Sequence, residues 1–258
     1  MVNVTLRIEV AGETNVGMKR NHNEDNFSII EESGLYVVAD GMGGHASGEV
    51  ASQMAVDSLR DFFQSTSSDP ERTWPYKMDR GKGYEENRLI TGIKLANLRI
   101  FETAQRDAKQ RGMGTTLVAL FAVEEGVYVA HVGDSRIYRV RAGKIEQLTE
   151  DHSLLNDYIK MKRLTAEEIA NFPHKNVIVR ALGMKDTVKV DTRFEKPMED
   201  DIYLLCSDGL SGPVTDEQIL EICTTAPDIK AAATQLIERA NENGGPDNIT
   251  VVLARWVV

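Results

Sequence analysis

Short runs of β-branched and aromatic residues, each bounded by turn-forming residues, recur along the whole of this 258-residue chain. Such runs predict β-strands. Several of the segments between them are short enough for hairpins, which join antiparallel strands. Adjacent hairpins favour two sheets packed face to face over a parallel, doubly wound sheet. The predicted strands are Asn26–Ile30, Leu35–Ala39, Thr116–Val123, Val127–Val132, Ile137–Val140, Val188–Phe194, Ile202–Cys206 and Ile249–Trp256.

Other segments repeat apolar residues at helical spacing. In one of them, apolar side chains recur every three or four positions from Leu89 to Ala104 and so share one face of a helix. These segments form two groups along the chain, which suits one helix pair on each side of a β core. The sequence therefore predicts an α+β fold. The predicted helices are Gly48–Phe63, Asn87–Ala108, Asp216–Thr224 and Ile229–Asn241.

Two regions lack a clear period. Residues 65–86 are polar and contain two prolines and two glycines before the next helix, which predicts a surface loop or a mobile insert. Residues 153–177 form a second irregular region, called the flap below. It has a short helical piece near Thr165–Ala170 that Thr165 can cap together with Glu168. No linker interrupts the pattern, so residues 1–258 are expected to form one domain.

The charge balance restricts the class of partner. The formal net charge is −10 at pH 7, whereas a nucleic-acid-binding protein carries a basic surface that neutralises phosphates. An acidic protein that handles phosphate must offset its own repulsion, and bound cations are one way to do so. Apolar residues make up 41% and charged residues 27% of the chain, as in ordinary globular proteins.

Cysteine usage and the N-terminus bear on the compartment. Cys206 and Cys223 are too few for a disulfide framework and fit a reducing environment. Both lie in apolar surroundings, which predicts buried thiols. The N-terminal segment lacks the features of a signal peptide, and no stretch approaches the ~20 apolar residues of a membrane span. We therefore expect a cytoplasmic protein without membrane contact, and a monomer because no extended apolar seam is visible.

Acidic residues gather beside glycine or at the ends of predicted strands. Asp40 and Asp208 each follow an apolar strand and precede a glycine. A single Asp-Gly pair is usually a turn, but a carboxylate at the end of a buried strand needs a partner, because an unpaired buried charge is costly. Glu24–Asp25 and Asp247–Asn248 add further oxygen donors. Several carboxylates with few nearby cations indicate a divalent metal, and oxygen donors favour Mg²⁺, Mn²⁺ or Ca²⁺ over Zn²⁺.

Motifs for competing chemistries do not occur. The chain has no GxxxxGK[ST] phosphate loop, no HExxH zinc helix and no G-x-S-x-G elbow for a serine nucleophile. Neither cysteine is followed by arginine at the spacing that a cysteine-dependent phosphatase needs. The run GMGGHASG lacks the spacing of a dinucleotide loop, and no Asp-Gly segment completes an EF-hand.

A set of segments in fixed order resembles one family. RNHNEDNF, ADGMGGHASGEVAS, GMGTTLVAL, HVGDSRIYR, LTEDHS, VIVRALG, LLCSDGLS and GGPDNITVVL are similar to motifs of the PP2C-type (PPM) serine/threonine protein phosphatases, in particular their bacterial eukaryote-like branch. The resemblance spans roughly Gly12 to Arg255. It implies a four-layer α-β-β-α sandwich, in which two central antiparallel sheets are flanked by helix pairs.

The resemblance also implies ligands for two metal ions. Asp40 matches the carboxylate that bridges both ions, and the Gly41 carbonyl matches a ligand of one of them. Asp208 and Asp247 match ligands of the first ion, and Glu24 matches a ligand of the second. No ligand position is substituted, which argues against an inactive relative.

Further roles follow from the same resemblance. Asp25 matches a carboxylate that orders metal-bound water, and Arg20 matches the phosphate-binding arginine. Asp134 matches a ligand of a third ion found in bacterial relatives, to which Asp208 also contributes. Asn176 falls near a flap position sometimes involved there.

The implied reaction is hydrolysis by a metal-activated water at a binuclear Mn²⁺ or Mg²⁺ centre. Two ions about 4 Å apart activate the water and clamp the phosphoryl oxygens, so no side-chain nucleophile is needed. Arg20 suits the developing charge because its planar fork bonds two oxygens at once. His45 aligns with a histidine proposed as the general acid, and a metal-bound water is the alternative.

The remaining polar residues of these motifs are expected to be structural. His22, His131, His152 and His174 are interpreted as structural or surface residues. Arg136 is expected to brace the Asp134 loop rather than to touch the substrate.

Alternatives to a protein phosphatase make different predictions. A non-catalytic module that binds phosphoproteins would be expected to lack a metal carboxylate. An enzyme for small phosphate esters, nucleotides or phosphotyrosine would carry the same metal site, so competition between a phosphopeptide and small esters would separate these activities. A purely structural acidic protein leaves the ordered carboxylates unexplained.

The family implies phosphorylated serine/threonine proteins as substrates and a Ser/Thr kinase among the partners. The flap and residues 65–86 are candidates for substrate selection, because loops on a rigid core often carry specificity.

Overall fold

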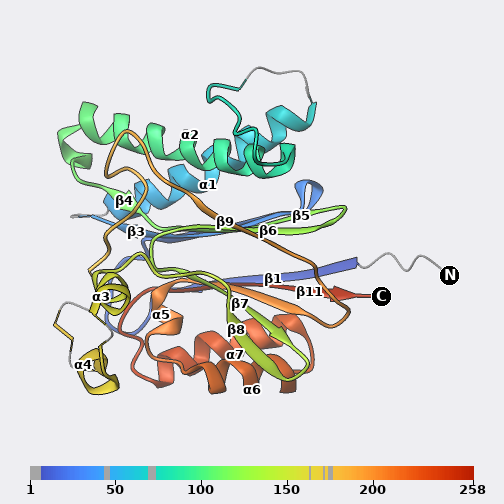
Figure 1. The fold of residues 1–258 in the computed structure, drawn as a ribbon. Coiled ribbons are helices and arrows are strands. Elements are labelled where there is room, and N and C mark those ends of the chain that lie inside the picture. Colours follow the sequence, from blue (N-terminus) through green and yellow to red (C-terminus); the bar gives the residue numbers. More distant parts are fainter. Residues whose placement is uncertain (1–6, 44–46, 69–73, 163, 171, 174–176) are drawn as a thin grey trace.

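The computed structural model describes residues 7–43, 47–68, 74–162, 164–170, 172–173 and 177–258. Two antiparallel sheets lie face to face, and a pair of long helices covers the outer face of each (Figure 1). The α+β, four-layer α-β-β-α arrangement expected from the sequence is confirmed.

The strands are β1 (Arg7–Asn15), β2 (Asp25–Ile30), β3 (Leu35–Met42), β4 (Gly114–Thr115), β5 (Leu117–Val123), β6 (Gly126–Val132), β7 (Arg136–Arg141), β8 (Lys144–Gln147), β9 (Asp191–Glu195), β10 (Ile202–Cys206) and β11 (Ile249–Val257). The helices are α1 (Ser47–Ser68), α2 (Tyr84–Arg106), α3 (Leu154–Lys162), α4 (Ala166–Ala170), α5 (Asp208–Ser211), α6 (Asp216–Thr225) and α7 (Ile229–Glu242), with 3₁₀ turns at Glu31–Ser33 and Ala108–Gln110.

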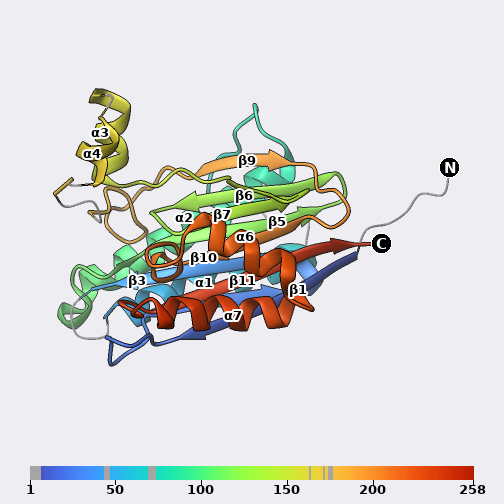
Figure 2. The same cartoon turned by 90° about the horizontal axis from the view of Figure 1, so that it is seen from below.

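The layers follow from the order of the strands. One sheet has the order β2-β3-β5-β6-β9, with β4 beside β3, and α1 and α2 cover it. The other has the order β1-β11-β10-β7-β8, and α6 and α7 cross its outer face, as the view from below shows (Figure 2). Both predicted helix pairs and the predicted hairpins are therefore present.

Strands in the middle of each sheet are apolar on both faces because both faces are covered. In β3, Leu35, Val37 and Ala39 pack against the helices, whereas Tyr36 and Val38 pack between the two sheets. All five are at most 3% exposed. Burying one such large side chain stabilises a fold by about 1.5–3 kcal/mol. A short, continuous apolar run is therefore the sequence pattern of a central strand in this sandwich.

The prediction of a loop over residues 65–86 is wrong at both ends. Helix α1 continues to Ser68, and α2 begins at Tyr84. Polar residues fit into the last turn of α1 because their side chains bond back to the helix: Thr66 Oγ1 donates to the Phe62 carbonyl at 2.8 Å. The described residues before α2 are anchored, since the Trp74 ring lies 5.0 Å from that of Tyr84.

The flap is more helical than the sequence predicts. Helix α3 occupies Leu154–Lys162, and α4 lies at the predicted short helical piece. The capping box is present: the Thr165 N–H donates to Glu168 Oε2 at 2.7 Å, and the Glu168 N–H donates to Thr165 Oγ1 at 3.2 Å. Both helices project from one end of the sheets (Figures 1 and 2).

Strand β1 was not predicted from the sequence, and neither were the short strands β4 and β8. β1 forms an edge strand that pairs along its whole length with β11, from Arg7 opposite Val257 to Asn15 opposite Ile249. Its residues are only partly buried, so it lacks the continuous apolar run that marks the central strands. The predicted strand at Val188–Phe194 begins later, at Asp191.

Candidate metal centre

Five carboxylates for which the resemblance implies a role at the metal centre come together at one end of the two sheets. Asp25 is the first residue of β2, and Asp40 lies directly opposite it in the pairing with β3. Asp208 follows β10 and begins α5. Asp134 lies just after β6, and Asp247 lies just before β11. Hairpin register and the packing of the two sheets thus bring five acidic side chains from distant parts of the sequence to one place.

Asp25 and Asp40 are the most deeply placed pair. Asp25 Oδ2 accepts hydrogen bonds from Ser207 Oγ at 2.8 Å and Thr250 Oγ1 at 2.7 Å. Burial nevertheless raises the pKa of Asp25 to about 7. Burial and repulsion from Asp25 and other carboxylates raise the pKa of Asp40 well above its ordinary value. Like charges directly opposite each other destabilise a strand pair, and either a compensating cation or a proton would relieve this repulsion.

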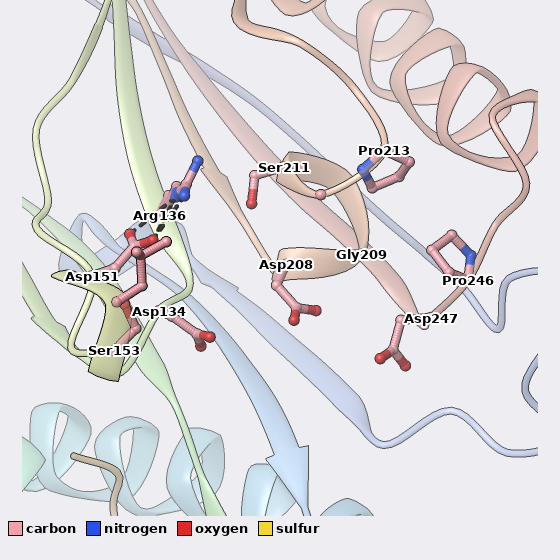
Figure 3. Close-up of a pocket in the computed structure, with 12 residues that line it drawn as sticks. Asp134, Arg136, Asp151, Ser153, Asp208, Gly209, Ser211, Pro213, Pro246 and Asp247 are labelled. Atoms are coloured by element: carbon pink, nitrogen blue, oxygen red, sulfur yellow. Dashed lines mark hydrogen bonds and ion pairs between the residues drawn. The ribbon is translucent and has the colours of Figure 1, made fainter. Parts of the chain in front are cut away.

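Three of the carboxylates face a shared space. The side chains of Asp134, Asp208 and Asp247 point toward it from three different segments (Figure 3). They line a cavity of about 320 Å³. Burial, with repulsion from Asp208, raises the pKa of Asp134 to about 7. Burial, with repulsion from Asp247, also raises the pKa of Asp208.

Glycines allow the backbone to approach closely here. A Cβ on Gly41 would lie 2.1 Å from the Gly48 carbonyl oxygen, so only glycine lets the end of β3 meet the first turn of α1. Glu24 lies at the same junction. Burial raises the pKa of Glu24, and a hydrogen bond from the Gly48 backbone opposes that shift. A Cβ on Gly209 would lie 1.9 Å from the Asn248 carbonyl oxygen.

Arg20 brings a positive charge to the rim of the site. Its Nη2 donates to Asp247 Oδ2 at 2.7 Å, and this bond raises the pKa of Arg20. Its side chain is 55% exposed and can turn toward a bound anion. His45, the candidate general acid, and Asn176 lie outside the described residues.

The residues fit one or more divalent cations. Two carboxylate oxygens at the site, Asp25 Oδ1 and Asp134 Oδ1, are buried and have no hydrogen-bond partner among the described residues. A buried carboxylate oxygen without a partner is costly, and a cation would remove that cost. The donors are all oxygens, as hard cations such as Mn²⁺ and Mg²⁺ prefer.

Asn248 and Thr116 position the backbone of the site in ways that the sequence did not predict. Asn248 holds the loop that carries Glu24: its Oδ1 accepts from the Glu24 N–H at 2.8 Å, and its Nδ2 donates to the carbonyls of Val16 and His22 at 2.9 Å. Thr116 Oγ1 accepts from the Asp40 N–H at 3.1 Å. Asn248 lies in the motif GGPDNITVVL and Thr116 in the motif GMGTTLVAL. Their place in these motifs was the only sign in the sequence that they have a role.

Arg136 lies as expected for a brace. Its Nη2 donates to Asp151 Oδ2 at 2.7 Å (Figure 3). Its Nη1 donates to the Tyr138 hydroxyl at 2.9 Å. The bond to Asp151 holds the segment just before the flap against the segment that carries Asp134.

A second cluster of ionisable side chains lies close by. His131, His152 and Asp191 each offer a potential ligand atom, and these atoms lie within 4.8 Å of one another. The Arg180 guanidinium lies beside them, however, with Nη1 2.9 Å from His152 Nε2 and 3.0 Å from Asp191 Oδ2. A metal ion would have to displace this cation, so the cluster is a hydrogen-bonded network in the present arrangement.

The network connects the flap to the metal centre. The Gly133 N–H, next to Asp134, donates to His152 Nδ1 at 3.0 Å. The His152 N–H donates to the Gly133 carbonyl, and the Val179 N–H donates to the His152 carbonyl, both at 2.9 Å. The structural interpretation of His131 and His152 agrees with this geometry.

Comparisons with known proteins identify the family of the chain. A family model described as Protein phosphatase 2C matches residues 18–255. The serine/threonine phosphatase Stp of Listeria monocytogenes is 38% identical over 247 residues, which cover 93% of this chain and 92% of that protein. The crystal structure of Mycobacterium tuberculosis PstP/Ppp superposes with a TM-score of 0.85 at 34% identity, covering 98% of this chain and 100% of that one.

A further solved structure bears on the metal. The catalytic domain of PstP in complex with two manganese ions superposes with a TM-score of 0.81 at 35% identity, covering 98% of this chain and all of that chain.

The chain described here belongs to the protein phosphatase 2C family. It is an enzyme of that class, a protein phosphatase. Among the described residues, no helix is long and apolar enough to cross a membrane.

Proposed function

We propose that this enzyme hydrolyses phosphoserine and phosphothreonine in proteins at a binuclear Mn²⁺ or Mg²⁺ centre. The observation that carries the proposal is the convergence of carboxylates at one place, with two buried oxygens, Asp25 Oδ1 and Asp134 Oδ1, that lack partners. Asp40 would bridge the two ions, with the Gly41 carbonyl on one of them. Asp208 and Asp247 would hold one ion and Glu24 the other, and Asp134, with Asp208, would hold a third. When bound, such ions supply an activated water and neutralise charge on the phosphoryl group.

The protein's own residues orient the reaction. Asp25, fixed by the Ser207 and Thr250 hydroxyls, presents its free Oδ1 as an acceptor that can orient a water molecule. Arg20 would exchange part of its bond to Asp247 for the substrate phosphate, whose charge grows on the equatorial oxygens during in-line attack. Hydrogen bonds between a guanidinium and a phosphate are stronger than those between neutral groups, because both partners are charged. His45 stays a prediction for the general acid.

The physiological role follows from the substrate class. We infer that the enzyme opposes Ser/Thr kinases, and that such a kinase is itself a substrate. Loss of the gene should then raise the phosphorylation of at least one kinase in the same cell. If every candidate kinase kept its phosphorylation state, this part of the proposal would be wrong.

The test is release of phosphate from a phosphothreonine peptide by the purified protein. We expect release with Mn²⁺, none with EDTA, and none from Asp208→Asn. The matched control is Asp186→Asn, an exposed aspartate outside the site, which should keep full activity. A folded protein that releases no phosphate with any divalent ion would overturn the proposal. Hydrolysis of small esters without hydrolysis of the peptide would favour a small-molecule phosphatase.

A further inference from the structure

A second cavity, of about 500 Å³, lies between α2, the residues that precede α2, and the segment that leads into β9. Among the described lining residues, none is shared with the cavity at the metal centre. Lysines reach this groove from three segments: Lys77 and Lys82 before α2, Lys94 on α2, and Lys189 before β9. Its size is that of a typical ligand site.

The charge of the groove is opposite to that of the whole chain. The protein has 40 acidic and 30 basic residues, yet four lysines line this groove. Asp79 is the single carboxylate among its described lining residues, and Asp79 Oδ1 already accepts from the Gly81 N–H at 2.9 Å. A local basic site on an acidic protein concentrates anions and repels cations.

Two of the lysines have charges available for a ligand. Lys82 pairs with Glu86, and Lys189 Nζ lies 3.2 Å from Asp191 Oδ1. Within the described part of the chain, Lys77 and Lys94 form no ion pair with a carboxylate. Lys94 is instead placed by Tyr76, whose ring centroid lies 5.7 Å from Lys94 Nζ.

Buried asparagines on α2 fix both walls of the groove. Asn87, 4% exposed, donates through Nδ2 to three carbonyls within residues 79–83 and accepts the Asp79 N–H at 2.8 Å. Asn97, 1% exposed, donates to two carbonyls and accepts an N–H within residues 183–186. The walls are therefore held before any ligand arrives, which lowers the entropic cost of binding.

We propose that this groove docks an anionic segment of a protein ligand, through carboxylate or phosphate groups. Lysine ammonium groups are point charges without a fixed fork, so they accept both kinds of anion. As a site that holds substrates of the phosphatase, the groove rests on the proposed function. The binding itself does not require activity and can be measured without metal.

The experiment is fluorescence anisotropy with a fluorescein-labelled oligoglutamate peptide and, separately, a multiply phosphorylated peptide, both in EDTA. Without metal the carboxylate centre repels anions, so binding reports the groove. We expect both peptides to bind in a salt-sensitive way and a matching oligoglutamine peptide not to bind. If only the phosphorylated peptide bound, the groove would still be an anion site, selective for phosphate. If neither bound at low salt, the proposal would be overturned.

The decisive variant is Lys77→Glu combined with Lys94→Glu. The matched control is Lys144→Glu combined with Lys230→Glu, two exposed lysines elsewhere that give the same change in net charge. Like charges across an interface are strongly unfavourable, so we expect the groove variant to weaken binding about tenfold or more and the control to weaken it much less. Equal weakening by both pairs would reduce the effect to net charge and overturn the proposal. Equal melting temperatures would show that both variants fold.

A kinetic arm connects the groove to catalysis. A phosphothreonine peptide with an acidic extension should show a lower KM than one with a neutral extension, and the groove variant should abolish that difference. Hydrolysis of p-nitrophenyl phosphate should be unchanged in the groove variant. If the wild type did not hydrolyse the small ester, this would count against the proposed function. If the groove variant still showed a lower KM for the acidic peptide than for the neutral one, this would count against docking in the groove.

Discussion

The carboxylate centre and the His131–His152–Asp191 network lie near each other but have opposite electrostatic designs. In the centre, acidic side chains repel one another and leave the Asp25 Oδ1 and Asp134 Oδ1 atoms without partners. In the network, the Asp191 carboxylate meets Arg180 at 3.0 Å and Lys189 at 3.2 Å. In the network, the Asp191 carboxylate is already paired with cations, which indicates a structural role. The centre has an excess of negative charge, which favours the binding of cations.

The pKa shifts express the same difference. At the centre, burial and repulsion raise the carboxyl pKa values. In the network, partial burial alone would raise the pKa of Asp191, but the bonds from Arg180 and His152 hold it well below its ordinary value. Burial lowers the pKa of His152 to about 4, so this imidazole is neutral at pH 7. A bound cation would therefore offset the repulsion in the first cluster, whereas the second already has its positive partners.

The largest expected effect is that of Asp40→Asn. Hydrolysis with Mn²⁺ should fall by about a thousandfold or more, because metal ions supply several kcal/mol of charge stabilisation. The metal-free variant should melt several degrees higher than the metal-free wild type, since the amide removes a buried charge. Thermal unfolding in EDTA checks this, with Asp186→Asn as the control. A lower melting temperature of the metal-free variant would show that repulsion between the carboxylates does not destabilise the metal-free wild type.

The second prediction concerns the pH dependence of stability in EDTA. The folded-state pKa of Asp134, about 7, lies above its ordinary value of 3.8, so its contribution to stability is present at low pH and lost as pH rises toward 7. His152 acts in the opposite direction: its contribution is present above pH 6.5 and lost as pH falls toward 4. Asp25, Asp40 and Asp208 contribute to the same slope, so Asp134→Asn should make it shallower, as measured by urea unfolding from acid to neutral pH. Saturating Mn²⁺ should suppress the same slope, and an unchanged profile would refute the assignment.

Two substitutions of His152 separate its two bonds. In His152→Asn, the side-chain oxygen Oδ1 can occupy the position of Nδ1 and accept a hydrogen bond from the Gly133 N–H. In His152→Gln, the longer side chain reaches Asp191 instead and leaves the Gly133 N–H unpaired. A buried unpaired donor costs about 1–3 kcal/mol. We therefore expect the Gln variant to bind Mn²⁺ several-fold more weakly and the Asn variant to bind it nearly normally. The Mn²⁺ dependence of the melting temperature measures both, and the reverse order would contradict the anchoring of Asp134 through Gly133.

The smallest expected effect is that of Lys189→Ala. This side chain is 77% exposed, and an exposed ion pair contributes about 0–1 kcal/mol. Arg180 and His152 would still hold Asp191. Urea unfolding should therefore show a nearly unchanged free energy, and a loss comparable to that of His152→Gln would mean that the network depends on its exposed lysine.

Local patterns were sufficient for much of the fold. Central strands such as Leu35–Ala39 are continuous apolar runs, and α2 shows its buried face in its spacing, because the period of the apolar residues reflects local geometry. The edge strand β1 was not predicted. It has no continuous apolar run, and its place comes from pairing with residues about 240 positions later in the chain. The interpretation of residues 65–86 failed because side-chain bonds extend α1 beyond its apolar period.

The sequence by itself determined the fold class and the family resemblance and predicted the residues of the metal centre, since these depend on local apolar patterns and on short motifs in a fixed order. Only the tertiary structure placed Asp25 opposite Asp40, left two of the carboxylate oxygens without partners and assigned Asn248 to the Glu24 loop. It also brought lysines 77 and 189, far apart in the chain, to one groove. Charge complementarity and hydrogen-bond completeness are properties of neighbours in space, and no local periodicity encodes which distant side chains become neighbours.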